Sequence, residues 1–345
     1  MELVKGTALL LIVLGLFSLF SYKAPKGMKA MGALANAAVA AFLVEAFQRF
    51  VGGDLLKIEF LGEVGDAAGS MGGVAAAALV ALALGVSPVY ALLLGVSCSG
   101  LGLLPGFFAG YLVSFLVKII EKKTPAGLDL IVTIIVAAPL VRFIGESVTP
   151  LVDATLLNIG GIITETANSN PILMGIILGG VITVVATAPL SSMALTAMLG
   201  LTGLPMAIGA LAVFGSSFMN YVLFHRLKLG DKRTNIAVAI EPLTQADIIT
   251  ANPIPVYVTN FFGGAAAGVV VSMFGLVNNA TGTATPIAGL AVMYGFNDPF
   301  KVTITALICA LAGAIAGYLG SLVFKNYKIK TVSEIRNDND LRKIA

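Results

Sequence analysis

The chain has 345 residues, of which 58% are hydrophobic and only 11% are charged, and its formal net charge is +3. This composition leaves too few water-binding groups to cover a soluble protein, so a soluble fold is excluded. The basic residues lie in short loops rather than on one face, and Cys98 and Cys309 lack CxxC or metal-ligand spacing. We therefore expect an all-α polytopic protein of the lipid bilayer, with no nucleic-acid partner, metal or cofactor.

Apolar segments recur along the whole chain. A span needs about 20 apolar residues. Residues 6–22, 29–51 and 127–144 each supply one, and no Asp, Glu, Lys or Arg occurs in residues 67–117, 166–225, 248–297 or 302–324. The pattern predicts about ten membrane segments, some of them re-entrant or broken.

Lysine and arginine gather at residues 23–29, 118–123, 226–233 and in the tail from residue 325, which predicts that these loops and the C-terminus are cytoplasmic. The acidic loop at 54–66 then lies outside. The return to the cytoplasm requires three short crossings within 67–117, broken near Pro88 and Pro105. We expect a bacterial-type cytoplasmic membrane protein with one transport domain over residues 1–324, of which 1–120 are scaffold-like and 127–324 bind substrate, and a cytoplasmic tail at 325–345.

Opposite charges one helical turn apart are predicted to meet on one helix face. Arg142 and Glu146 have this spacing, and so do Glu45 and Arg49. The apolar stretch 156–163 is too short to span the membrane, so we expect it at the surface.

Two interrupted segments, residues 186–195 and 283–292, share small or hydroxyl residues around a proline. Interrupted segments in corresponding positions of two halves indicate a transporter's binding site. Small residues and proline also serve close helix packing, but their recurrence favours a site. The candidate ligand-binding residues here are Thr187, Pro189, Ser191, Ser192, Thr283 and Thr285.

Glu241 ends a short apolar run and is followed by Pro242, which prevents simple helical continuation. An ionisable group in apolar surroundings is a candidate for function, and a carboxylate can accept hydrogen bonds from sugar hydroxyls. A half-helix dipping into the membrane and an interfacial loop with solvated carboxylates both fit the pattern. Uncharged groups that suit a polyol, or that cap helices, are Thr244, Asn252, Asn278 and Asn279.

The order of motifs resembles the membrane subunit IIC of the sugar phosphotransferase system, in its fructose and mannitol-like branch and within it the divergent PfoR-like group. The segment 170–179 leads to a turn at Pro189, Glu241 falls where that family carries a Thr-Glu-Gly motif, and the segments 252–257, 262–268 and 278–289 follow in order. The similarity extends over about residues 69–324.

The resemblance implies that Glu241 is the catalytic residue that contacts the sugar, and that the protein is a homodimer with an elevator-type motion. Separate IIA and IIB proteins would supply the phosphoryl group, so the chain is at most the membrane component of a phosphotransferase, with no phosphorylated residue of its own. Two departures are Pro242 in place of the family glycine, and the absence of the family histidine near Ala280 and Thr281.

Two other functions stay open. A secondary or facilitated carrier of another polar metabolite would not need phosphorylation, and Glu241 or Asp247 would be its proton site. A membrane sensor would report a ligand to a partner through the polar tail at 325–345.

Overall fold

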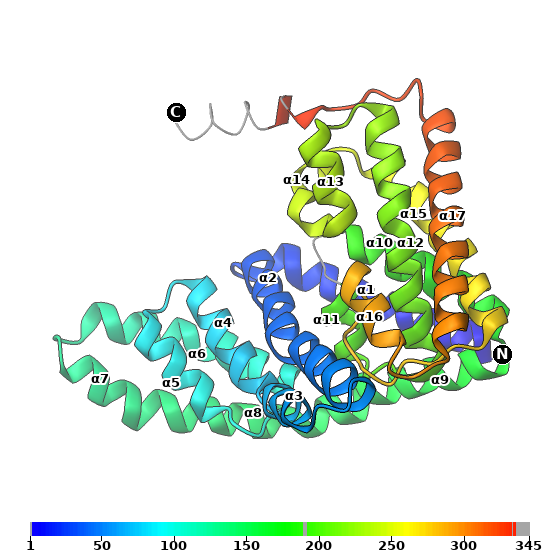
Figure 1. Ribbon diagram of the computed structural model, residues 1–345. Helices are drawn as coiled ribbons and strands as arrows, with labels where there is room; N and C mark the ends of the chain where they lie inside the picture. Colours follow the sequence, from blue (N-terminus) through cyan, green and yellow to red (C-terminus); the bar gives the residue numbers. More distant parts are fainter. Residues whose placement is uncertain (1, 189–191, 333, 336–345) are drawn as a thin grey trace. The chain divides into compact units, whose positions relative to one another are not determined.

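The computed structural model describes residues 2–188, 192–332 and 334–335, and every regular element in these ranges is helical (Figure 1). An all-α polytopic membrane fold is confirmed. Within the described residues, six helices are long and apolar enough to cross a bilayer: Gly27–Leu55, Leu103–Lys123, Leu128–Ser169, Gly203–Leu227, Pro253–Phe274 and Pro299–Val323. The other apolar segments are a pair bent by 54°, Glu59–Gly69 with Gly72–Leu84, and three shorter helices at Thr7–Lys23, Pro88–Ser97 and Pro171–Thr187.

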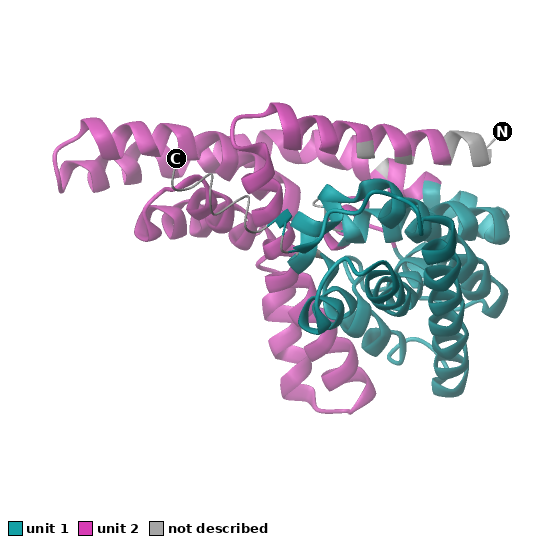
Figure 2. Cartoon of the chain, turned by 90° about the horizontal axis from the view of Figure 1, so that it is seen from above, with its two compact units in different colours: residues 1–3, 163–192, 202–345 teal, residues 4–162, 193–201 magenta. Residues whose placement is uncertain are grey.

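The chain forms two compact units (Figure 2). Unit 1 comprises residues 1–3, 163–192 and 202–345, and unit 2 comprises residues 4–162 and 193–201.

Unit 2 contains α1 (Glu2–Lys23) from Val4 onwards, and the helices α2 (Gly27–Ala38), α3 (Glu59–Gly69), α4 (Gly72–Leu84), α5 (Pro88–Ser97) and α6 (Leu103–Lys123). Helix α2 continues through wide π-helical turns at Val39–Leu43 and Ala46–Leu55. The breaks on either side of α5 lie where the sequence predicts them. Gly85 ends α4 with a φ of 91°, and Pro88 then begins α5 because its fixed φ suits a first helical turn.

Lys26 and Lys118 lie at the same end of unit 2. Their ammonium groups donate to the carbonyl of Leu84 at 2.8 and 3.0 Å, where the last turn of α4 leaves acceptors unsatisfied. The proximity of Lys118 lowers the pKa of Lys26. The first two basic loops therefore lie on one side of unit 2, as the positive-inside rule requires.

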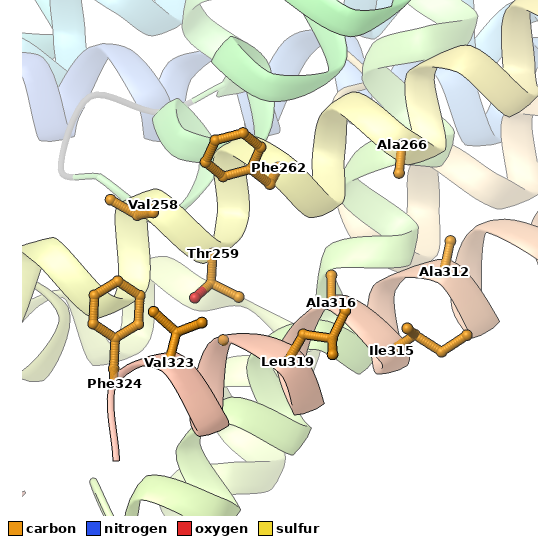
Figure 3. A pocket seen from close by; sticks show the side chains of 11 residues that line it. Val258, Thr259, Phe262, Ala266, Ala312, Ile315, Ala316, Leu319, Val323 and Phe324 are labelled. Atoms are coloured by element: carbon orange, nitrogen blue, oxygen red, sulfur yellow. The ribbon is translucent and has the colours of Figure 1, made fainter. Parts of the chain in front are cut away.

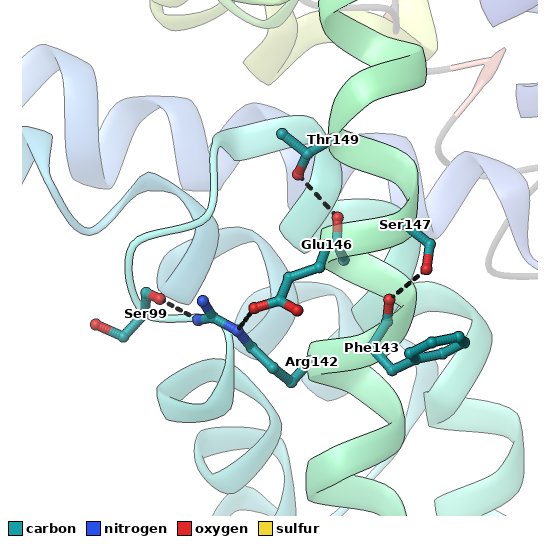
Figure 4. Close-up of polar contacts among 7 residues, drawn as sticks. Ser99, Arg142, Phe143, Glu146, Ser147 and Thr149 are labelled. Atoms are coloured by element: carbon teal, nitrogen blue, oxygen red, sulfur yellow. Dashed lines mark hydrogen bonds and ion pairs between the residues drawn. The ribbon is translucent and has the colours of Figure 1, made fainter.

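Residues 128–169 form one long helix, made of α7 (Leu128–Val132), α8 (Ala138–Val152) and α9 (Asn158–Ser169) with π-helical turns between them. The stretch 156–163 is part of this helix rather than an element of its own. Gly160 lies so close to the main chain of Leu199 that a Cβ there would meet its carbonyl carbon at 2.7 Å, and this packing fits the helical path. Within α8 the predicted pair is confirmed: Arg142 Nε lies 2.7 Å from Glu146 Oε1, and Arg142 also donates to the carbonyl of Ser99 (Figure 4).

Unit 1 is built on four packed helices: α10 (Pro171–Thr187), α12 (Gly203–Leu227), α15 (Pro253–Phe274) and α17 (Pro299–Val323). Paired GxxxG motifs join α10 to α15. A Cβ on Gly268 would lie 2.8 Å from the carbonyl carbon of Gly175, and one on Gly179 would lie 3.0 Å from that of Gly264. Helices in lipid associate through such close backbone contact, because lipid tails provide little hydrophobic driving force between them.

Buried amides add to this interface. The side-chain amide of Asn260, in α15, donates to the side chain of Asn220, in α12, at 2.7 Å. The main-chain carbonyl of Asn260 accepts from the hydroxyl of Thr183, in α10, at 2.8 Å. Asn220 and Asn260 are fully buried, so an unpaired amide there would be costly. The sequence signal for this cluster is the presence of polar residues within charge-free spans, and the sequence motifs did not point to it.

Candidate functional site

The candidate site residues that the structure describes all lie in unit 1. Pro189 and Ser191 lie outside the described residues. The others are Thr187, Ser192, Glu241, Thr244, Asn252, Asn278, Asn279, Thr283 and Thr285.

The two interrupted segments contact each other. Helix α10 ends at Thr187, and α11 (Ser192–Met198) begins at Ser192, whose hydroxyl donates to the carbonyl of Ala284 at 2.6 Å. Thr285 then precedes α16 (Pro286–Met293) in an extended conformation. Thr187, Ser192 and Thr285 are all buried. The segments that the sequence pairs by similarity are therefore also neighbours in space.

Side chains of the second segment hold its own turn together. Asn278 Nδ2 donates to Thr283 Oγ1 at 2.9 Å, and Asn278 Oδ1 accepts from the N–H of Ala280 at 2.9 Å. Thr283 in turn donates to the carbonyl of Ala280. Asn278 and Thr283 are fully buried, whereas Asn279 is exposed. This arrangement fits the turn-forming alternative for Asn278 and gives the segment a fixed backbone at a point where the helix is interrupted.

Glu241 lies at the break between two short helices, α13 (Lys232–Ile240) and α14 (Ala246–Ala251), which are joined by a 3₁₀ turn over Pro242–Gln245. Asp231 caps the start of α13, accepting from the N–H of Thr234 at 2.8 Å, and this hydrogen bond lowers the pKa of Asp231. Glu241 is half-buried, and its carbonyl accepts from the N–H and the hydroxyl of Thr244, which is itself exposed. Helix α13 contacts α12 and α16, and the turn over Pro242–Gln245 contacts α10, so this element borders helices that belong to both interrupted segments.

The side chain of Asn252 is engaged by the C-terminal tail. Its Nδ2 donates to the carbonyl of Lys330 at 2.8 Å, and its Oδ1 accepts from the Lys330 N–H at 2.9 Å. Asn252 is fully buried. Next to it, Ile329, Val332 and Ile335 pack against an apolar cluster that joins α12, α13, α14 and α15.

We predict that Asn252→Ala loosens the tail, because two hydrogen bonds to the Lys330 main chain are lost. Trypsin cleavage after Lys328 and Lys330 should become at least about fivefold faster. Thr250→Ala is the matched control, since the Thr250 hydroxyl bonds only within its own helix. Equal cleavage of the two variants would contradict the docking role of Asn252.

The grooves on the transmembrane helices have a different chemistry. One of about 520 Å³ lies between α15 and α17 and is lined by Phe262, Ala266, Ile315 and Leu319 among other apolar side chains (Figure 3). Another of about 490 Å³ in unit 2 is lined mainly by aliphatic and phenylalanine side chains. Neither contains a candidate site residue, and apolar walls do not favour a polar solute.

Helices interrupted by buried polar turns, in a chain with several membrane spans, define a membrane transport protein. The family model of the phosphotransferase system EIIC matches residues 28–337, and the chain belongs to this family. It is therefore a multi-pass membrane component of a sugar phosphotransferase system, which transports sugars and works with IIA and IIB proteins. No curated protein and no solved structure matches the chain.

Proposed function

We propose that this protein is the permease of the fructose and mannitol-like branch, in its PfoR-like group, and that it carries a sugar or polyol across the cytoplasmic membrane. Residues 127–324 bind the solute and residues 1–120 are the scaffold of a homodimer that works by an elevator-type movement. Glu241 accepts hydrogen bonds from the sugar hydroxyls, and the tail lies in the cytoplasm.

The observation that carries this proposal is the hydrogen bond between Ser192 and the Ala284 carbonyl, which joins the two interrupted segments. Main-chain groups near a helix interruption are free of regular helical pairing and can serve a ligand instead. Glu241 supplies a carboxylate at the neighbouring break, and Thr187 and Thr285 supply hydroxyls. Together these groups suit a neutral ligand with several hydroxyl groups.

Direct binding tests the substrate class. Purified protein should bind radiolabelled mannitol or fructose, and unlabelled sugar or polyol should displace it. Ser192→Ala should weaken this binding about tenfold, because the link that fixes the two segments is lost. Ser147→Ala is a control, since Ser147 is an exposed residue bonded within its own helix. Failure of the wild type to bind any sugar or polyol would refute the proposal.

The docked tail favours a sensor role as the second candidate function. Ile329, Val332 and Ile335 pack on the same short helices that flank Glu241, so a ligand at this break has a physical route to the tail. In a sensor, Asn252→Ala abolishes signalling to a cytoplasmic partner while leaving sugar binding intact. Loss of transport without any signalling defect would favour the permease alone.

A further inference from the structure

The hydroxyl of Ser217, in the middle of α12, is buried without a partner. Ser217 is 9% exposed, and its Oγ makes no hydrogen bond within the described part of the chain. The hydroxyl of the neighbouring Ser216 has a partner, because it donates to the carbonyl of Val213 at 2.7 Å. A buried hydroxyl left unpaired is costly, and such groups in folded proteins call for an explanation such as a ligand.

Ser217 lies on a face of α12 that contacts α16 towards one end and α13 towards the other. Residues seven apart lie on the same face of a helix, so Ala210, Ser217 and Phe224 share one face of α12. At one end of this face Ala210 packs against α16, where a Cβ on Gly289 would lie 3.3 Å from the Ala210 Cβ. At the other end Phe224 packs in a cluster with Val238 of α13. Ser217 therefore lies on this face between the residue that contacts α16 and the residue that packs with α13.

Ser217 and Glu241 lie at similar distances, along their own helices, from the loop that joins α12 to α13. Helices α12 and α13 are in contact and are joined by the short loop 228–231, so they run antiparallel (Figure 1). At 1.5 Å per residue, Ser217 lies about 15 Å before the end of α12 at Leu227, and Glu241 lies about 14 Å beyond the start of α13. Asn235, whose Oδ1 is also unpartnered among the described residues, lies about 9 Å from Glu241 along α13.

We propose that Ser217 is a ligand-binding residue that acts with Glu241, and that its hydroxyl bonds to a hydroxyl of a sugar or polyol between α16 and the Glu241 break. The inference rests on the proposed function. A serine hydroxyl donates one hydrogen bond and accepts others, so it can pair with a ligand hydroxyl that acts as acceptor or as donor. The carboxylate of Glu241 only accepts. The bound ligand supplies the partner that the empty protein lacks.

Two serine variants separate a binding role from a structural one. Ser217→Ala should weaken binding of radiolabelled mannitol or fructose about tenfold, with a thermal midpoint within about 1 °C of the wild type, because no protein hydrogen bond is lost. Ser216→Ala should leave the affinity unchanged. Unchanged affinity in Ser217→Ala, or a matching loss in Ser216→Ala, would overturn the proposal.

Cysteine variants test the accessibility of position 217 without relying on the identity of the sugar. In a background with Cys98→Ala and Cys309→Ala, Ser217→Cys should react with a charged methanethiosulfonate at least about tenfold faster than Ser216→Cys. Equal or slower reaction would overturn the proposal. Rapid reaction that no sugar or polyol slows would instead keep Ser217 as a reagent-accessible site and refute the proposed substrate class.

Discussion

Glu241→Gln should reduce sugar uptake about 100-fold in kcat/KM, because a charge-assisted hydrogen bond to the ligand is replaced by a neutral one. The side chain keeps its size and lies half-buried at a helix break, so the fold should be retained. The Glu241 carbonyl accepts the hydrogen bond from Thr244 that holds the following turn, and the substitution keeps this carbonyl. An unchanged thermal midpoint in Glu241→Gln would then assign a loss of activity to the ligand rather than to the fold. Initial rates of radiolabelled uptake into proteoliposomes provide the measurement.

Glu165→Gln is the matched control, since Glu165 is an exposed carboxylate in the same unit. It should transport at the wild-type rate. If Glu241→Gln kept more than half of the wild-type uptake, the carboxylate would have no role in binding. A loss of uptake only when a proton gradient drives it would favour the secondary carrier, with Glu241 as its proton site.

Gly268→Val should destabilise unit 1 by about 3 kcal/mol or more, because the new side chain has no space at the contact of α10 and α15. A Cβ at Gly268 would lie 2.8 Å from the carbonyl carbon of Gly175 and 3.2 Å from the Gly179 Cα. These are main-chain atoms, which cannot rotate away as a side chain can. We expect little folded protein in detergent by size-exclusion chromatography, and a lowered thermal midpoint for what remains.

Ala266→Val adds the same bulk to the same helix, but its side chain points into the open groove between α15 and α17 (Figure 3). This variant should express and melt like the wild type. Similar destabilisation by both substitutions would show that helix propensity, and not the glycine contact, governs the stability of α15.

Features set by neighbouring residues could be predicted from the sequence. Gly85 and Pro88 interrupt the chain through their own backbone preferences, and so does Pro242 after Glu241. The Arg142–Glu146 pair follows from one-turn spacing. Glu45 and Arg49 have the same spacing, yet Arg49 pairs with Asp66, which only the packing of α3 brings near.

Features set by residues far apart in sequence could not be predicted. Ser192 and Ala284 are separated by 92 residues, and nothing local specifies their hydrogen bond. The sequence predicts that the Asn252 amide binds ligand. In the structure its side-chain nitrogen and oxygen both bond to the main chain of Lys330, 78 residues later. Ser217 and Ser216 are chemically identical neighbours, and only tertiary structure shows which hydroxyl lacks a partner.

As an EIIC protein that works with IIA and IIB proteins, the proposed permease should move its sugar or polyol in a step coupled to phosphorylation. Uptake of radiolabelled mannitol or fructose into vesicles, with and without the phosphoryl donor system, tests it most directly. We predict that the label accumulates inside as the sugar phosphate only when the donor proteins are present. Equal accumulation of the free sugar without any donor would contradict the claim.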